Sequence, residues 1–241
     1  MEAFGGLPMP DRGGLTVTEL FTLLISVSLL GTILIGAAMR REHDHDLILC
    51  AGHLRSLALG ATRYAIEHQG QMPGAHPDEG DWWCGSISPY VKNFKTTIIC
   101  PDAAQDAVEV GNAYAAWTVR LKMPVSKTDG HRALMIHGSY GFNGYLSHAS
   151  YVAASPMRPM FGDCIWYDAK PRFSDTVPQN LFLGNYNLNR NDQMGNFCIQ
   201  RHNGRINMAL LGGAVETLRL SALWSLNWNG VNTGEDAVKS P

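Results

Sequence analysis

The stretch Gly13-Gly14-Leu15-Thr16-Val17-Thr18-Glu19 decides the fold, together with the apolar segment from Leu20 to Met39 that follows it. No charged residue occurs between positions 20 and 39. As a helix this segment would be about 30 Å long, which matches the hydrocarbon core of a bilayer. A carboxylate buried in a bilayer costs about 2.5–3.5 kcal/mol on insertion scales. The charge of Glu19, at the edge of such a segment, should therefore be compensated.

The helical pattern continues beyond the apolar segment. Gly70 and Pro73 are typical signals for the end of a helix. We therefore predict one helix from about Thr16 to His68, with its second half packed on a sheet. That half carries a stripe of apolar or small residues in steps of three and four, namely Leu47, Cys50, Leu54, Leu57, Ala58, Ala61, Tyr64 and Ala65.

Length and charge limit the remaining possibilities. The chain has 241 residues, and the part after the membrane-length segment suffices for one ordinary domain. Its formal net charge is −2, and it has no basic patch, so we expect no nucleic-acid partner. The many Gly, Asn, Ser and Trp residues favour a β-rich region with long loops, about 102–138 and 168–200.

The cysteines all follow the apolar segment. Because five is an odd number, at least one cysteine stays free or pairs between chains. In an oxidising compartment we expect Cys84 to pair with Cys100, which would close a local loop, and Cys164 with Cys198 as a second choice. Spacing alone leaves the connectivity open. The absence of a C-x-x-C pair argues for a structural role over zinc or redox chemistry.

The N-terminal stretch resembles the type IV prepilin signal of pilins and of type II secretion pseudopilins. In that family a leader ends in Gly, a peptidase cuts after it, and the new N-terminal residue is methylated. The resemblance implies cleavage between Gly14 and Leu15. It also implies that Glu19, the fifth residue of the mature chain, pairs with the N-terminal amine of a neighbouring subunit. The family usually has Phe where this chain has Leu15.

Five further segments resemble, in order, a pseudopilin-like family common in planctomycetes and verrucomicrobia. They are the stretch from Cys50 to Pro73, Ile99-Cys100-Pro101, Ser139–Tyr145, Phe161-Gly162-Asp163 and Arg201–Glu216.

The last of these segments departs from the family pattern. The family's Asp-Gly-His is Gly212-Gly213-Ala214 here, so any role of that Asp and His is absent. Two glycines still suit a tight hairpin between strands at about 206–211 and 214–220. The motif is therefore interpreted as architectural.

The resemblance implies an α+β, pilin-like fold, in which a long N-terminal helix packs on a mainly antiparallel sheet. The expected organisation is a leader at 1–14, a transmembrane and assembly helix at 15–39, its periplasmic continuation at 40–69 and a β-rich domain at 70–241. Expected partners are the prepilin peptidase, other pilin or pseudopilin subunits and the inner-membrane assembly platform. The expected location is the inner membrane with a periplasmic domain, and then a cell-envelope filament.

Several other features were weighed as sites. An Asn-rich loop offers oxygen atoms for calcium from Asn187, Asn189, Asn191 and Asp192, although a run of polar turns explains it equally. Otherwise we expect no cofactor. Arg201-His202 with Asp163 could support acid–base chemistry, but packing of the terminal strands is the simpler explanation. No nucleophile elbow or phosphate loop accompanies them, so we do not expect an enzyme.

Two alternatives to an assembly subunit stay open. The first is a signal-anchored binding module that never polymerises, with a glycan surface made by Trp82, Trp83, Trp224 or Trp228. The second is an anchored enzyme built on His202, Asp163 and His137. A cleaved secretory signal fits less well, because its apolar stretch would be about 7–15 residues long.

Overall fold

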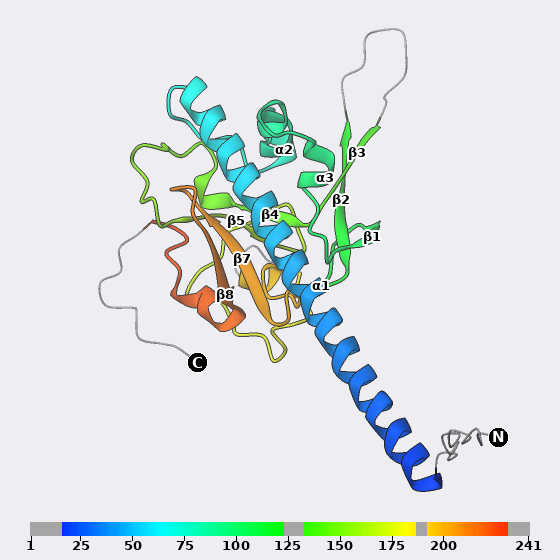
Figure 1. The fold of residues 1–241 in the computed structure, drawn as a ribbon. Helices are drawn as coiled ribbons and strands as arrows, with labels where there is room; N and C mark the ends of the chain where they lie inside the picture. Colours follow the sequence, from blue (N-terminus) through cyan, green and yellow to red (C-terminus); the bar gives the residue numbers. More distant parts are fainter. Residues whose placement is uncertain (1–15, 123–132, 187–191, 231–241) are drawn as a thin grey trace, which may run out of the picture. The chain divides into compact units, whose positions relative to one another are not determined.

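The computed structural model describes residues 16–122, 133–186 and 192–230. The chain forms two compact units, Met1–Glu42 and His43–Pro241 (Figure 1). The residues on either side of the expected cleavage position, Gly14 and Leu15, lie outside the described residues.

The N-terminal helix α1 spans Val17–Glu67, which confirms the predicted helix. A reciprocal cap begins it, because the Thr16 backbone N–H donates to Glu19 Oε2 at 2.8 Å and the Glu19 backbone N–H donates to Thr16 Oγ1 at 3.3 Å. After its last turn, Gln69 and Gly70 have positive φ angles of 57° and 83°. The Gly70 N–H bonds to the Ala65 carbonyl at 2.8 Å, which satisfies one of the terminal carbonyls.

The part of α1 in the first unit is apolar and exposed. It makes α1 long and apolar enough to cross a membrane. Its few hydroxyl groups donate to carbonyls of the preceding turn, at 2.7–2.9 Å, from Thr22, Ser26, Ser28 and Thr32. Hydroxyls satisfied inside the helix can enter a bilayer without leaving an unpaired polar group.

The part of α1 in the second unit is one wall of the main hydrophobic core. The predicted stripe is buried from Cys50 to Ala65, whereas its first member, Leu47, is only half-buried. It belongs to one core cluster with aromatic rings from the rest of the domain. Phe161 lies at the centre of these rings, with its centroid 5.1 Å from both Trp83 and Phe142. This burial of large rings supplies much of the driving force for folding.

The remaining elements of the second unit are short. The α-helices are α2 (Trp83–Ile87) and α3 (Phe94–Thr97). The 3₁₀ turns are Pro77–Glu79, Ser88–Tyr90, Gly144–Leu146, Met194–Asn196 and Leu220–Ser225. The strands are β1 (Ala104–Val108), β2 (Ala115–Lys122), β3 (Ala133–Gly138), β4 (Tyr140–Asn143), β5 (Pro159–Asp163), β6 (Asp168–Ala169), β7 (Arg205–Leu210) and β8 (Val215–Arg219).

These strands form two mixed sheets, of order β1-β2-β3 and β6-β4-β5-β7-β8. The α+β class is therefore correct, but the expectation of a mainly antiparallel sheet needs correction. β1 pairs with β2 in parallel, and β6 pairs with β4 in parallel. Both parallel pairings lie at a sheet edge, whereas the pairings β2–β3, β4–β5, β5–β7 and β7–β8 are antiparallel.

The predicted hairpin at the end of the chain is confirmed. β7 and β8 pair antiparallel around the glycine turn, with Ala209 opposite Val215. Gly213 has a φ of 84°, which a residue with a Cβ rarely adopts. The turn is closed by the Leu210 N–H, which donates to the Ala214 carbonyl at 2.8 Å. The antiparallel pairing of β7 with β5 places the residues that precede β7 beside the end of β5.

Two leucines on α1 test its role in the core. Leu54 is fully buried, whereas Leu59 is 47% exposed. We expect Leu54→Ala to lower the free energy of unfolding of the second unit by about 2–5 kcal/mol, because it leaves a cavity. Leu59→Ala should change it by less than about 0.5 kcal/mol. Urea denaturation of the full chain in detergent, followed by tryptophan fluorescence, measures both; equal losses would contradict this packing.

Candidate functional site

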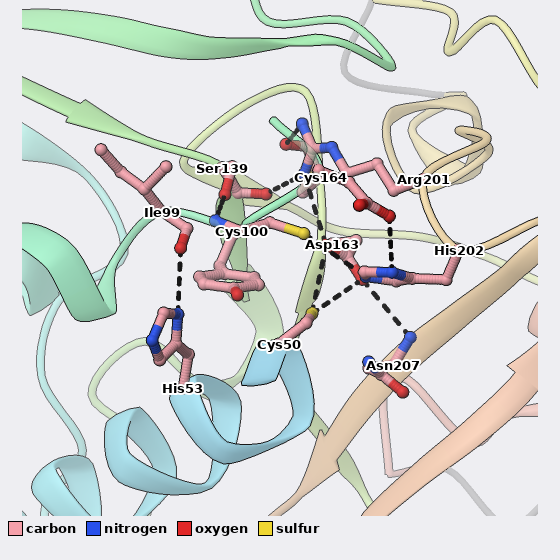
Figure 2. Close-up of polar contacts among 12 residues, drawn as sticks. Cys50, His53, Ile99, Cys100, Ser139, Asp163, Cys164, Arg201, His202 and Asn207 are labelled. Atoms are coloured by element: carbon pink, nitrogen blue, oxygen red, sulfur yellow. Dashed lines mark hydrogen bonds and ion pairs between the residues drawn. The ribbon is translucent and has the colours of Figure 1, made fainter. Parts of the chain in front are cut away.

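The described residues contain one buried cluster of potential metal ligands: Cys50, Cys100, Asp163 and His202. Their ligand atoms all lie within 4.8 Å of one another. Figure 2 shows these side chains directed toward a common centre. Residues 50 and 202 are far apart in the sequence, so only the folded second unit brings the cluster together.

Each member is positioned by a different element. Cys50 lies on the buried stripe of α1, and Asp163 ends β5. Cys100 follows α3, where its backbone N–H donates to Ser139 Oγ. Beside it, the Ile99 carbonyl is 3.0 Å from Nδ1 of His53 (Figure 2).

His202 precedes β7 and is followed by a tight turn. Asn203 and Gly204 have φ angles of 55° and 76° in this turn. The Arg205 N–H donates to the His202 carbonyl at 3.2 Å and closes it. Without this turn the chain could not present His202 to the core and enter β7 three residues later.

The two ring nitrogens of His202 face different partners. Nδ1 lies 2.8 Å from Asp102 Oδ2, and neither atom has a further hydrogen-bond partner among the described residues. Nε2 lies 3.4 Å from Asp163 Oδ2 and 3.4 Å from Cys100 Sγ. Burial opposes protonation, but the contacts with Asp102 and Asp163 raise the pKa of His202 to about 12. Asp102 therefore fixes the ring so that Nε2 faces the cluster.

Asp163 is a fully enclosed carboxylate with several donors around it. Arg201 Nη1 lies 3.4 Å from its Oδ1, and the Asn207 backbone N–H lies 3.4 Å from its Oδ2. Burial raises the pKa of Asp163, but His202 and Arg201 outweigh it and hold the pKa below the usual value.

Arg201 is itself held by backbone carbonyls. It donates to the carbonyls of Ser139, Asn112 and Cys164, with the contacts to Asn112 and Cys164 at 3.0 and 3.4 Å. The side chain of Asn207 extends the network to the helix, because its Nδ2 donates to the Leu47 carbonyl at 3.0 Å.

The two thiols of the cluster are not equivalent. Burial raises the pKa of Cys50 strongly, and its neighbours Cys100 and Asp163 raise it further. Its Sγ lies 3.5 Å from Asp163 Oδ2 and 3.6 Å from Oδ1. Burial also raises the pKa of Cys100, but contacts with Cys50 and His202 and the charge of Arg201 outweigh it, and the net shift is downward. Cys100 is thus the thiol that ionises first.

The expected cysteine pairs are not formed. All five cysteines are free and buried, so neither Cys84 with Cys100 nor Cys164 with Cys198 is a disulfide in this structure. Cys100 has Cys50 as a neighbour in the cluster instead. The expected pairing relied on closeness along the sequence, whereas the core brings together residues 50 positions apart.

None of the other predicted site residues that the structure describes belongs to the cluster. Glu19 is at the start of α1, where it accepts from both the backbone N–H and the hydroxyl of Thr16 at 2.8 Å. Of the calcium candidates, Asn187, Asn189 and Asn191 lie outside the described residues. Asp192 accepts from the Thr176 backbone N–H at 3.1 Å.

The residues suggested for an anchored enzyme are only partly brought together. His202 and Asp163 meet, but His137 lies on β3 and contacts Thr118 Oγ1 at 2.9 Å. All four tryptophans suggested for a glycan surface, Trp82, Trp83, Trp224 and Trp228, are buried. They pack in the core, because burial of their large apolar rings is favourable.

The segments that carry the family resemblance converge on the cluster. Each of the five contributes at least one residue that contacts it or belongs to it. No single segment has the spacing of a metal-ligand motif. Nothing in the sequence therefore indicated that Cys50, Cys100 and Asp102 lie together. Comparison with protein-family models, with curated proteins and with solved structures found no match.

The buried charge of Asp163 gives a test of the site. We expect Asp163→Asn to lower the free energy of unfolding by about 3–5 kcal/mol, because it leaves Arg201 without its buried counter-charge. The matched control is Asp78→Asn, since the Asp78 side chain is 90% exposed and lies 3.2 Å from His76. An exposed pair of this kind contributes little, so we expect no measurable change. Equal stability of the two variants in urea denaturation would contradict the account.

Proposed function

We propose that this chain is a membrane-anchored structural subunit of a pilin-like filament, a type IV pilus or a type II secretion pseudopilus. The observation that carries the proposal is α1, which is exposed and apolar in one unit and forms the core wall in the other. A helix of this kind needs a second apolar environment for its exposed part. Lipid provides it before assembly, and copies of the same helix provide it within a filament.

The exposed part of α1 is too large to remain in water. Its large apolar side chains from Val17 to Met39 are between 48% and 72% exposed. Each such side chain gains about 1.5–3 kcal/mol when it is buried completely. A Cβ added at Gly31 or Gly36 would meet nothing within 4 Å, so neighbouring helices could approach closely there.

In this proposal Glu19 has two roles, one within its own chain and one between chains. Within one chain it caps α1 through Thr16. Between chains it would neutralise the N-terminal amine of Leu15 on a neighbouring subunit. In a low-dielectric interior such a pairing is strong only when both charges are present and well placed.

A second candidate function is a static anchored module that binds glycans. A cleft of about 520 Å³ favours it, because its lining includes Trp166, Tyr186, His76 and Lys170. The Trp166 and Tyr186 rings lie 5.0 Å apart, and aromatic faces beside polar groups suit sugars. Retention of glycans by an uncleaved chain would favour this module over a filament subunit.

Glu19 and Thr16 separate the capping role from the pairing role. We expect Glu19→Ala to be cleaved and methylated but to enter filaments poorly, because the partner amine loses its counter-charge. Thr16→Ala removes the hydroxyl of the cap and keeps the carboxylate, so it should assemble normally. An antibody against the chain would measure how much of each variant is in the sheared filament fraction and how much stays in the membrane fraction. Normal assembly of Glu19→Ala, or equal failure of the two variants, would contradict the pairing.

The cleavage position has a direct test. We expect Gly14→Arg to leave a precursor of unprocessed size in the membrane fraction, because the peptidase requires the small residue before the cut. The wild-type chain in the same cells should be shorter by the leader of residues 1–14. A band of mature size from Gly14→Arg would refute the site.

A further inference from the structure

We propose that Cys50, Cys100, Asp163 and His202 bind one zinc ion, which ties α1 to the central sheet. The four side chains offer two sulfurs, one oxygen and one nitrogen, a set that zinc accepts in tetrahedral sites. Two thiolates exclude magnesium and calcium, which prefer oxygen, and the carboxylate and imidazole make copper(I) a poorer fit. The site would exist whether or not the chain polymerises.

Three of the six distances between the ligand atoms match a tetrahedral site. Zinc with ordinary bond lengths places sulfur about 3.5 Å from a nitrogen or oxygen ligand, and nitrogen about 3.4 Å from oxygen. Cys100 Sγ lies 3.4 Å from His202 Nε2, and Cys50 Sγ lies 3.5 Å from Asp163 Oδ2. His202 Nε2 lies 3.4 Å from Asp163 Oδ2. No pair exceeds 4.8 Å, and the widest ideal separation, between two sulfurs, is about 3.8 Å.

A hydrogen-bonded network alone explains these distances less well. Charge-assisted bonds between nitrogen and a carboxylate are about 2.7–2.9 Å long. The bond of His202 to Asp102 has that length, at 2.8 Å, but the contact of His202 with Asp163 is 3.4 Å. The inner contact is thus too long for a strong hydrogen bond and has the length of a tetrahedral edge.

The surroundings are those of a metal ligand shell. Zinc-bound histidines usually have a carboxylate at their other ring nitrogen, and the ion pair of His202 Nδ1 with Asp102 Oδ2, at 2.8 Å, provides one. Arg201 lies beside Oδ1 of Asp163, which leaves Oδ2 facing His202 and Cys50. His202 and Asp163 are therefore each oriented by a neighbour that would not itself bind the ion.

An independent sign of a missing ligand is the Tyr140 hydroxyl. Tyr140 is fully buried, and its hydroxyl has no hydrogen-bond partner among the described residues. Burial raises the pKa of Tyr140 well above its usual value, and the charges of Cys50, Cys100 and Asp163 and a contact with the Cys50 side chain raise it further, so the hydroxyl lies beside the cluster although it makes no hydrogen bond of ordinary geometry there. A buried hydroxyl without a partner is costly. A thiolate bound to zinc would give it an acceptor, whereas a neutral thiol is a weak one.

Binding would follow a simple proton balance. Four bonds form from zinc to the two sulfurs, the Asp163 oxygen and His202 Nε2. The protons of both thiols and of Nε2 leave to solvent, and no electrons are transferred. Because all four positions come from the protein and all four residues are buried, the ion would be structural.

The first experiment measures metal in the wild-type full chain, purified in mild detergent without chelators. Mass spectrometry under native conditions and elemental analysis should give about one zinc per chain, as expected for a closed site. Replacement of zinc by cobalt(II) should give the strong visible bands of a tetrahedral ion with thiolate ligands. A chain without metal would overturn the proposal, whether its mass shows free thiols or the loss of two hydrogens in a Cys50–Cys100 disulfide. Cobalt spectra that lack thiolate bands would also overturn it.

Variants assign the ligands. Cys50→Ala and Cys100→Ala should lose the zinc, whereas Cys84→Ala, which removes a buried thiol outside the cluster, should keep about one equivalent. Asp102→Asn should retain the ion but bind it about 10–100-fold more weakly in competition with a chelator, since it only orients His202. A full equivalent of zinc in Cys50→Ala and Cys100→Ala would overturn the assignment.

Discussion

The negative charge of a carboxylate inside a protein core has to be compensated, and the core of this domain is arranged around the groups that compensate the charge of Asp163. Arg201 and His202 face it from the segment before β7, Cys50 faces it from α1, and Asn207 donates to it from β7. Breaking a buried ion pair costs far more than forming it gains. These segments are therefore held in one relative position, and the helix, the central strand and the final hairpin form a single packed unit.

The same helix has a different task in each unit. Its residues from Cys50 to Ala65 are committed to the core, so they are unavailable to any partner. Its residues from Val17 to Met39 are exposed and apolar, with their hydroxyls satisfied inside the helix. Because one part of α1 is buried in the core and the other is exposed and apolar, we favour a filament subunit over a simple anchor.

Local sequence patterns predicted the parts of the fold that neighbouring residues determine, namely the long helix, its end and the final hairpin. Apolar or small residues spaced three and four apart predicted the buried stripe of α1. Gly70 predicted the end of the helix, and Gly212-Gly213 predicted the β7–β8 hairpin. Pairings across the sequence were not predictable in this way. The parallel edge strands β1 and β6 were missed, and Cys100 was assigned to Cys84 because the two are close in sequence. The cluster was missed for the same reason, since its ligands are single residues from four segments.

The measurement that tests the proposed function most directly is the N-terminal sequence and intact mass of the chain purified from its own membranes. The account predicts a chain that begins at Leu15 and carries one additional methyl group on its amine. That result would require prepilin processing, which serves assembly. A chain that begins at Met1 or Glu2 would contradict the account, because Glu19 would then have no free amine nearby to pair with, and α1 would be a static anchor.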